Sequence, residues 1–184
     1  MTNNNRLGEV MDTIEMKYTA KQAMQSIVEC LNDGTEKAIQ IITIQRIAES
    51  ERKLFAKMFG HWLHKQKRRA FLVANSTELL NQMVKSIENG YRGIKIVGTA
   101  TWELQGMSDD KILNRINGAE ADCVIASLPL DIEDAFTKRN RLSLHAKVWI
   151  GLGTKREWEM QISFFSRVQR WIASAKGKKN KNDQ

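Results

Sequence analysis

Short apolar runs alternate along this chain with longer segments in which apolar residues recur every three or four positions. The runs predict β-strands and the periodic segments predict amphipathic helices. The predicted strands are Met11–Met16, Ala38–Ile44, Ala70–Ala74, Ile94–Val97, Cys123–Ala126 and Ala146–Ile150. The predicted helices are Ala20–Leu31, Arg46–Lys65, Thr77–Glu88, Ser108–Ile116, Asp131–Asn140 and Glu157–Ala173.

Local signals support several of these boundaries. Thr19 followed by Gln22 forms a capping-box pattern before the first helix, and Asn75-Ser76 offers caps for the third. Strands separated by helices favour parallel pairing, with helices on both faces of the sheet. We therefore predict an α/β fold, a Rossmann-like three-layer sandwich with a mainly parallel sheet of five or six strands. Ala70–Ala74 and Cys123–Ala126, apolar at nearly every position, are expected at its centre.

Length and composition indicate one domain. The chain has 184 residues and is 42% hydrophobic, enough for a sizeable core. We expect one α/β domain over residues 1–175, followed by a basic, disordered tail over 176–184. No apolar run reaches the roughly 18 residues of a spanning helix, and the polar first residues lack the core of a signal peptide. These features predict a cytoplasmic protein.

Charge and cysteine content narrow the choice of partner only slightly. The net charge of +8 permits attraction to phosphates on a nucleotide sugar, a lipid or a nucleic acid. A nucleic-acid-binding motif is missing, which makes nucleic acid an unlikely partner. Cys30 and Cys123 each lie among apolar residues and are interpreted as buried free thiols. The scattered histidines and cysteines give no metal-ligand spacing, so neither a metal nor a cofactor is predicted.

Ligands of parallel α/β sheets bind at the carboxyl ends of the strands. The candidate residues at these predicted ends are polar residues and glycines. The candidate substrate-binding residues are Thr43, Gln45, Asn75, Ser76, Gly98, Thr99, Ser127, Pro129, Gly151 and Gly153. The candidate catalytic residues are the carboxylates Asp131 and Glu133, which follow a strand end.

Each candidate also has a structural interpretation. Asp131 and Glu133 can supply negative charge to the first turn of a helix. Asn75-Ser76 can act as plain caps, and the glycines near 151 can form a simple turn. His61 and the basic residues after it are typical of a solvated helix face, and His145 is expected on the surface.

The predicted last helix carries large apolar residues on one face with arginines between them, and lysines follow it. Such a helix can pack on its own sheet, on a second subunit, or on an anionic membrane. The sequence leaves these three options open.

Four stretches, in order, resemble the WecG/TagA/CpsF glycosyltransferase family. The first is RAFLVANSTELLNQMVKSIENGYRGIKIVG, a strand, a helix, an aromatic-x-Gly turn and a strand ending in Ile-Val-Gly. ILNRINGAEADCVIA is similar to the family's helix ending in Ile-Asn, its Ala-Asp and the next strand. Pro129 with Glu133 is similar to its Pro-Lys-Gln-Glu segment, and AKVWIGLG to its closing strand. The stretch TIEMKYTAKQAMQSI adds a match upstream, so the resemblance covers roughly Val10 to Gly153.

The resemblance implies a bacterial, metal-independent, inverting transferase. Such an enzyme moves an N-acetylhexosamine from a UDP-sugar to a polyprenyl-diphosphate-linked acceptor during synthesis of cell-surface polysaccharide or teichoic acid. It works at the inner face of the cell membrane, and basic terminal helices hold some members there. The family's Thr-x-Asn is matched by Thr43-Ile44-Gln45.

The sequence also departs from the family. The family's Asp-Gly pair, whose Asp is the proposed general base, has no counterpart between the predicted helix ending near Lys65 and the strand at Ala70. A glycine-rich turn is replaced by Ala126-Ser127-Leu128, and the Gln of Pro-Lys-Gln-Glu is lost. Two hypotheses follow: a transferase with little or no activity alone, or a catalytically inactive partner of an active family member. Self-association is a further expectation.

Overall fold

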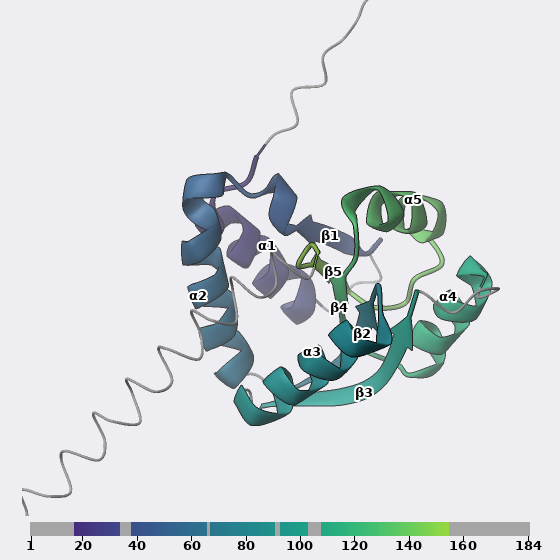
Figure 1. Ribbon diagram of the computed structural model, residues 1–184. Helices are drawn as coiled ribbons and strands as arrows, with labels where there is room; N and C mark the ends of the chain where they lie inside the picture. Colours follow the sequence, from purple (N-terminus) through teal and green to yellow (C-terminus); the bar gives the residue numbers. More distant parts are fainter. Residues whose placement is uncertain (1–16, 34–37, 66, 91–92, 103–107, 155–184) are drawn as a thin grey trace, which may run out of the picture.

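A computed structural model describes residues 17–33, 38–65, 67–90, 93–102 and 108–154 of the chain. Within this part, five parallel strands form one sheet in the order β1-β5-β4-β2-β3 (Figure 1). The strands are β1 (Gln40–Thr43), β2 (Arg68–Ala74), β3 (Ile94–Thr101), β4 (Cys123–Ser127) and β5 (Val148–Gly151). The predicted α/β fold with a parallel sheet is confirmed. β4 is the middle strand and β2 lies beside it, so both expected central strands are interior strands of the sheet.

Helices cover both faces of the sheet (Figure 1). The helices are α1 (Ala20–Asn32), α2 (Glu49–Lys65), α3 (Thr77–Gly90), α4 (Asp109–Gly118) and α5 (Leu130–Asn140), with a 3-10 turn η1 (Ile44–Arg46) after β1. One apolar cluster joins α1, α2 and α3 to the first face, and a second joins α4 and α5 to the other. Strand residues alternate between the two clusters, since successive side chains point to opposite faces. This gives the three layers that the sequence predicts.

The start of α1 has the capping box that its local sequence predicts. The Thr19 hydroxyl accepts a hydrogen bond from the backbone N–H of Gln22, and the Gln22 side chain accepts one from the N–H of Thr19. Two backbone donors that have no partner inside the helix are satisfied in this way. The predicted capping box is therefore confirmed, and the helix ends one residue later than predicted.

Two boundaries differ from the prediction. The expected strand Ile94–Val97 continues to Thr101, because β3 pairs with β2 up to Ala74. The expected helix from Arg46 begins only at Glu49, because the backbone of residues 46–48 instead bonds to Tyr18 beside α1. Both differences come from pairing between segments that are distant in sequence, which a local pattern does not contain.

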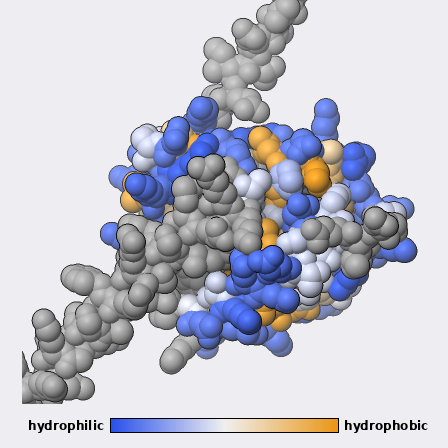
Figure 2. All heavy atoms as spheres, in the orientation of Figure 1, coloured by the Kyte–Doolittle hydropathy of each residue, from blue (hydrophilic) through white to orange (hydrophobic). Residues whose placement is uncertain are grey.

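Several predictions fall outside the described residues: the strand Met11–Met16, the helix Glu157–Ala173 and the tail over 176–184. In the described part, no helix is both long and apolar enough to cross a bilayer. Where Figure 2 shows described residues, the surface is mostly hydrophilic, with small separate hydrophobic spots.

Candidate functional site

The carboxyl ends of four strands lie side by side and form one edge of the sheet. Thr43 of β1 pairs with Gly151 of β5, and Gly151 pairs with Ala126 of β4. Ser127 then pairs with Ala74 at the end of β2, and its carbonyl accepts the N–H of Asn75 at 3.0 Å. The structure thus brings together the predicted site residues that follow β1, β2, β4 and β5.

Thr43 has an unusual environment at this edge. Its side chain is 0% exposed, and among the described residues its Oγ1 has no hydrogen-bond partner. By strand alternation it lies on the same face as Ile41, which packs in the cluster of α4 and α5. A buried hydroxyl without a partner costs about 1–3 kcal/mol. Such a group in a native fold calls for an explanation, and a ligand that bonds to it is one.

Ser127 and Gly153 tie the ends of β4 and β5 together. The buried Ser127 hydroxyl donates to the Gly153 carbonyl at 2.6 Å. Gly153 has φ = 76°, a left-handed conformation that favours glycine. These two predicted site residues therefore have a structural role in shaping the turn after β5.

Asn75 and Ser76 lie between β2 and α3. The Ser76 hydroxyl accepts the N–H of Leu79 at 3.2 Å, which makes it a cap of α3. Asn75 is half-buried at the head of the same helix. A helix N-terminus attracts anions through its free N–H groups and its dipole. The capping interpretation of Ser76 is confirmed, and it leaves Asn75 as the polar side chain that can contact a ligand.

Two arginines that were not singled out from the sequence hold the turn after β1 in place. Arg46 in η1 contacts both carboxylate oxygens of Asp134 on α5 at 3.0 Å through one nitrogen. Arg52 donates to the backbone carbonyl of Gln45 at 3.3 Å, which fixes the turn after β1. Arg46 and Asp134 lie 88 positions apart. Only their opposite charges, an arginine after one strand and an acid in a distant helix, could have indicated the pair from the sequence.

Glu133 is completely buried beneath α5. Its Oε1 accepts a hydrogen bond from Trp149 Nε1 at 3.1 Å, and the indole packs against Phe136 with ring centroids 5.5 Å apart. The carboxylate also lies directly on Gly151, where a Cβ atom would overlap it. The indole of Trp149 gave no sign of this role in the sequence, because an apolar strand position predicts core packing.

Asp131 has the opposite environment. It is exposed in the first turn of α5, just after the Pro129 cap, whose carbonyl accepts the N–H of Glu133. The two candidate carboxylates are therefore not equivalent. Asp131 can meet a molecule at the carboxyl edge, whereas Glu133 is enclosed by Trp149 and Gly151.

Gly98 and Thr99 are not at a strand end. Both lie inside β3, because this strand continues to Thr101. The Phe71 ring rests on Gly98, where a Cβ would be 2.5 Å from a ring carbon, and the Thr99 carbonyl accepts a hydrogen bond from Arg115. The prediction that they end the strand is wrong, and packing against β2 and α4 accounts for both residues.

The two cysteines, His61 and His145 belong to no metal-binding group among the described residues. Cys30 is half-buried, Cys123 is buried, and the two form no disulfide. Burial, with Asp122 nearby, raises the pKa of the Cys123 thiol to about 12, so it stays protonated and unreactive at neutral pH. His61 and His145 are exposed. In the described part of the chain, no three His, Cys, Asp or Glu side chains are grouped so that they could hold a metal ion.

The sequence profile described as "Glycosyl transferase WecG/TagA/CpsF family" matches residues 38–155, more than half of the chain. The match begins before β1 and extends just past β5, so it covers all five strands and the whole carboxyl edge. The chain belongs to the WecG/TagA/CpsF glycosyl transferase family. No curated protein matches the chain.

One feature of the fold distinguishes this WecG/TagA/CpsF chain from the pattern that it resembles. α2 ends at Lys65 and β2 begins at Arg68. This short connection has no room for the segment with an Asp-Gly pair that was expected to carry a general base. The carboxyl edge therefore offers hydroxyl and amide groups for binding, and Asp131 as its exposed candidate carboxylate.

Proposed function

We propose that the carboxyl edge of the sheet binds the nucleotide part of a UDP-N-acetylhexosamine. Membership of the WecG/TagA/CpsF family supports this proposal. The observation that carries it is Thr43, a buried hydroxyl without a partner among the described residues, at the edge where parallel sheets bind ligands. Gln45 follows it by two residues, and Asn75 at the head of α3 completes a set of polar, uncharged groups. Such groups suit the hydroxyl and carbonyl oxygens of a nucleotide sugar.

Thr43→Val tests this binding site, because valine keeps the shape of threonine and removes the hydroxyl. If a ligand uses the hydroxyl, the variant should bind UDP and UDP-N-acetylglucosamine roughly tenfold more weakly in a calorimetric titration, the worth of about one hydrogen bond. The folded protein should lose no stability, since an unpaired buried polar group is removed. Undiminished affinity in Thr43→Val would contradict the proposal.

Thr137→Val is the matched control. Thr137 is also buried, but its hydroxyl donates to the Glu133 carbonyl at 2.8 Å within α5. The same substitution should therefore cost stability, about 1 kcal/mol, and leave nucleotide affinity unchanged. A loss of affinity in both variants would indicate a general disturbance of the fold and not a contact at Thr43.

We further propose that the chain alone transfers sugar slowly or not at all. An inverting transfer needs a base to take the proton of the acceptor hydroxyl, and such a group typically contributes 10²–10⁴-fold to the rate. The short connection between α2 and β2 leaves no place for the expected base. Steady release of UDP from purified protein, UDP-N-acetylhexosamine and a polyprenyl-diphosphate-linked acceptor would refute this. Asp131→Asn would then identify the replacement base, because Asp131 is exposed at the edge.

The same short connection favours a second function, that of a catalytically inactive partner of an active family member. In this role the carboxyl edge still binds nucleotide, and the active partner supplies the base. Adding this chain to an active member should then change the partner's rate of UDP release. Equal rates of UDP release with and without the chain would exclude the second function. The proposed nucleotide site would still be tested separately, by the calorimetric titration with UDP.

A further inference from the structure

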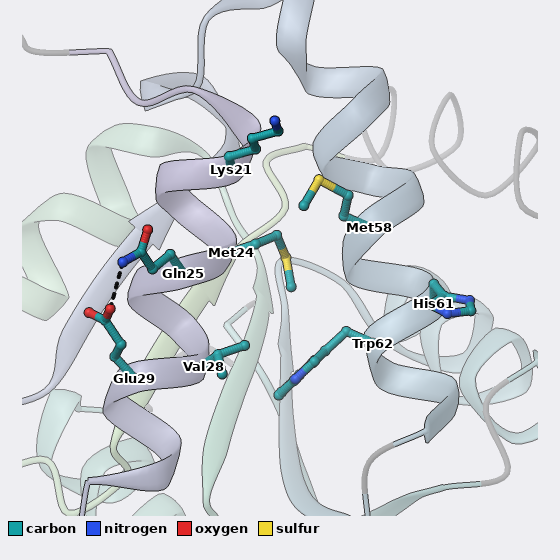
Figure 3. A pocket seen from close by; sticks show the side chains of 8 residues that line it. All are labelled: Lys21, Met24, Gln25, Val28, Glu29, Met58, His61 and Trp62. Carbon is teal, nitrogen blue, oxygen red and sulfur yellow. Dashed lines mark hydrogen bonds between the residues drawn. The ribbon is translucent and has the colours of Figure 1, made fainter.

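An open groove lies between α1 and α2, on the outer side of the first helical layer. Its volume is about 550 Å³. Figure 3 shows Met24 and Val28 of α1 facing Met58 and Trp62 of α2 across the groove. The floor of the groove is therefore apolar.

The apolar surface continues along α2. Leu54, Met58 and Trp62 are spaced four residues apart and so form an apolar stripe on one face of the helix. Leu54 is 41% exposed, and Met58 and Trp62 are half-buried. An apolar stripe that is open to solvent marks a surface that another segment can cover.

A segment of the same chain has a complementary face. Within residues 157–173, which lie outside the described part, large apolar residues recur every three or four positions, as on one side of a helix. They are Trp158, Ile162, Phe165, Val168 and Ile172. At about 3.6 residues per turn, Arg167 and Arg170 fall on the opposite side. The apolar side can therefore meet the groove while both arginines point to solvent.

The described part of the chain ends at the edge of the sheet where the groove begins. Thr154 follows β5 by three residues and so lies at the carboxyl edge. α1 packs on β1 and β5, and Tyr18 just before α1 pairs with Ile47 just before α2. Both helices therefore begin side by side at the carboxyl edge, and the chain leaves β5 beside the head of the groove.

The length of the segment also matches the groove. Two residues separate Thr154 from Glu157, so the connection spans at most about 10 Å and reaches only a surface that begins at the carboxyl edge. The helix predicted over Glu157–Ala173 has 17 residues, as α2 has, and both are about 25 Å long at about 1.5 Å per residue. A helix that starts at this edge can therefore follow α2 over its whole length.

The charges at the head of the groove agree with this occupant. Lys21 lies in the first turn of α1, at one end of the groove (Figure 3), and forms no ion pair with another described residue. Glu157, in the first turn of the predicted helix, has the opposite sign. We infer that residues 157–173 form an amphipathic helix that lies along the α1–α2 groove and covers the apolar stripe of α2.

The short connection favours this segment over a second copy of the chain. A segment that is tethered beside its site has an effective concentration that is roughly millimolar, far above that of a second copy in dilute solution. A second copy docking through the same face would also bring the exposed Lys53 and Lys57 of both chains together, which is unfavourable. The contact requires neither nucleotide binding nor turnover.

Hydrogen exchange of the full chain, measured by mass spectrometry, tests the contact. We expect the amides of 157–173 to exchange at least about tenfold more slowly than those of 176–184, at every protein concentration. Leu54→Gln should raise the exchange rate of 157–173 several-fold, because it removes apolar area from the groove side of the contact. Leu142→Gln is the matched control, because Leu142 is 89% exposed just after α5, on the opposite layer. It should change this rate less than about twofold.

The reciprocal experiment follows the oxidation of Met58 by dilute peroxide. Phe165→Gln should uncover the groove and speed this oxidation several-fold. Met83, which is 0% exposed in the core, should react no faster, and this shows that the domain stays folded. Arg167→Gln changes the opposite side of the same segment and should alter the oxidation of Met58 less than about twofold.

Several results would overturn the inference. These are exchange of 157–173 as fast as that of 176–184, equal effects of the two leucine variants, and oxidation of Met58 that does not respond to Phe165→Gln. Protection that rises with protein concentration would assign the groove to a second copy, and protection that appears only with phosphatidylglycerol vesicles would assign the segment to a lipid surface. UDP titrations should be unchanged in every variant, so a failure of this contact and a failure of the nucleotide site are read separately.

Discussion

The contact between Glu133 and Gly151 offers the sharpest test of the site's architecture. In Gly151→Ala, the new Cβ would lie 2.5 Å from the Glu133 Cδ and overlap the carboxylate. The carboxylate must then move, and its hydrogen bond from Trp149 Nε1 is lost inside the core. Overpacking costs typically about 1–3 kcal/mol and a lost charge-assisted hydrogen bond about 1.5–3 kcal/mol. We therefore expect Gly151→Ala to lower the free energy of unfolding by about 3–5 kcal/mol.

Urea unfolding followed by circular dichroism measures this change directly. Gly118→Ala is the control, because a Cβ there meets no atom within 4 Å. Alanine near the end of α4 should be neutral or stabilise by up to about 1 kcal/mol.

A double-mutant cycle identifies the clash as the cause. Glu133→Ala removes the carboxylate, so adding Gly151→Ala to it should cost much less than in the unmodified protein. The coupling free energy should reach about 1.5 kcal/mol or more, as expected for residues in contact. If Gly151→Ala stays within about 0.5 kcal/mol of the unmodified protein, or if the two effects simply add, the buried carboxylate does not hold α5 against β5 as described.

Three other predictions test separate contacts. Gly98→Ala should destabilise by about 1–3 kcal/mol, because the Phe71 ring occupies the space of the new methyl group; unchanged unfolding in urea would contradict this. The pKa of the Cys123 thiol is raised in the folded protein, so on raising the pH the thiol ionises in the unfolded chain before it ionises in the folded one. The contribution of the buried thiol to stability is therefore complete below about pH 9 and falls toward pH 12. The stability difference between the unmodified protein and Cys123→Ala should therefore shrink over that range, by about 1.4 kcal/mol per pH unit, and a constant difference would refute the shift. Asp134→Asn should cost less than about 1 kcal/mol, since its pair with Arg46 is about a third exposed, and a larger loss in urea would show a buried role.

The sequence predicted the layers well because they depend on local periodicity. Alternating strand and helix patterns indicated a parallel sheet, and the apolar runs of β2 and β4 indicated that both are sandwiched. The capping box at Thr19 was also readable, since all of its partners lie within three residues. The sequence also identified the residue types that lie together at the carboxyl edge, including Thr43 and Asn75.

The end of β3 and the roles of the two candidate carboxylates were decided by tertiary structure alone. β3 continues to Thr101 because β2 lies beside it, although glycine and threonine at positions 98 and 99 look like a strand end. Asp131 and Glu133 lie two residues apart, yet one is exposed and the other enclosed by Trp149 and Gly151. Helix periodicity predicts that two such positions face different ways, but not which side chain meets β5, because that depends on where α5 packs on the sheet. For the same reason, the hydroxyl of Thr43 was visible as a chemical group in the sequence, but its burial followed only from the packing of β1 beside β5. That it has no partner among the described residues likewise followed only from the tertiary structure.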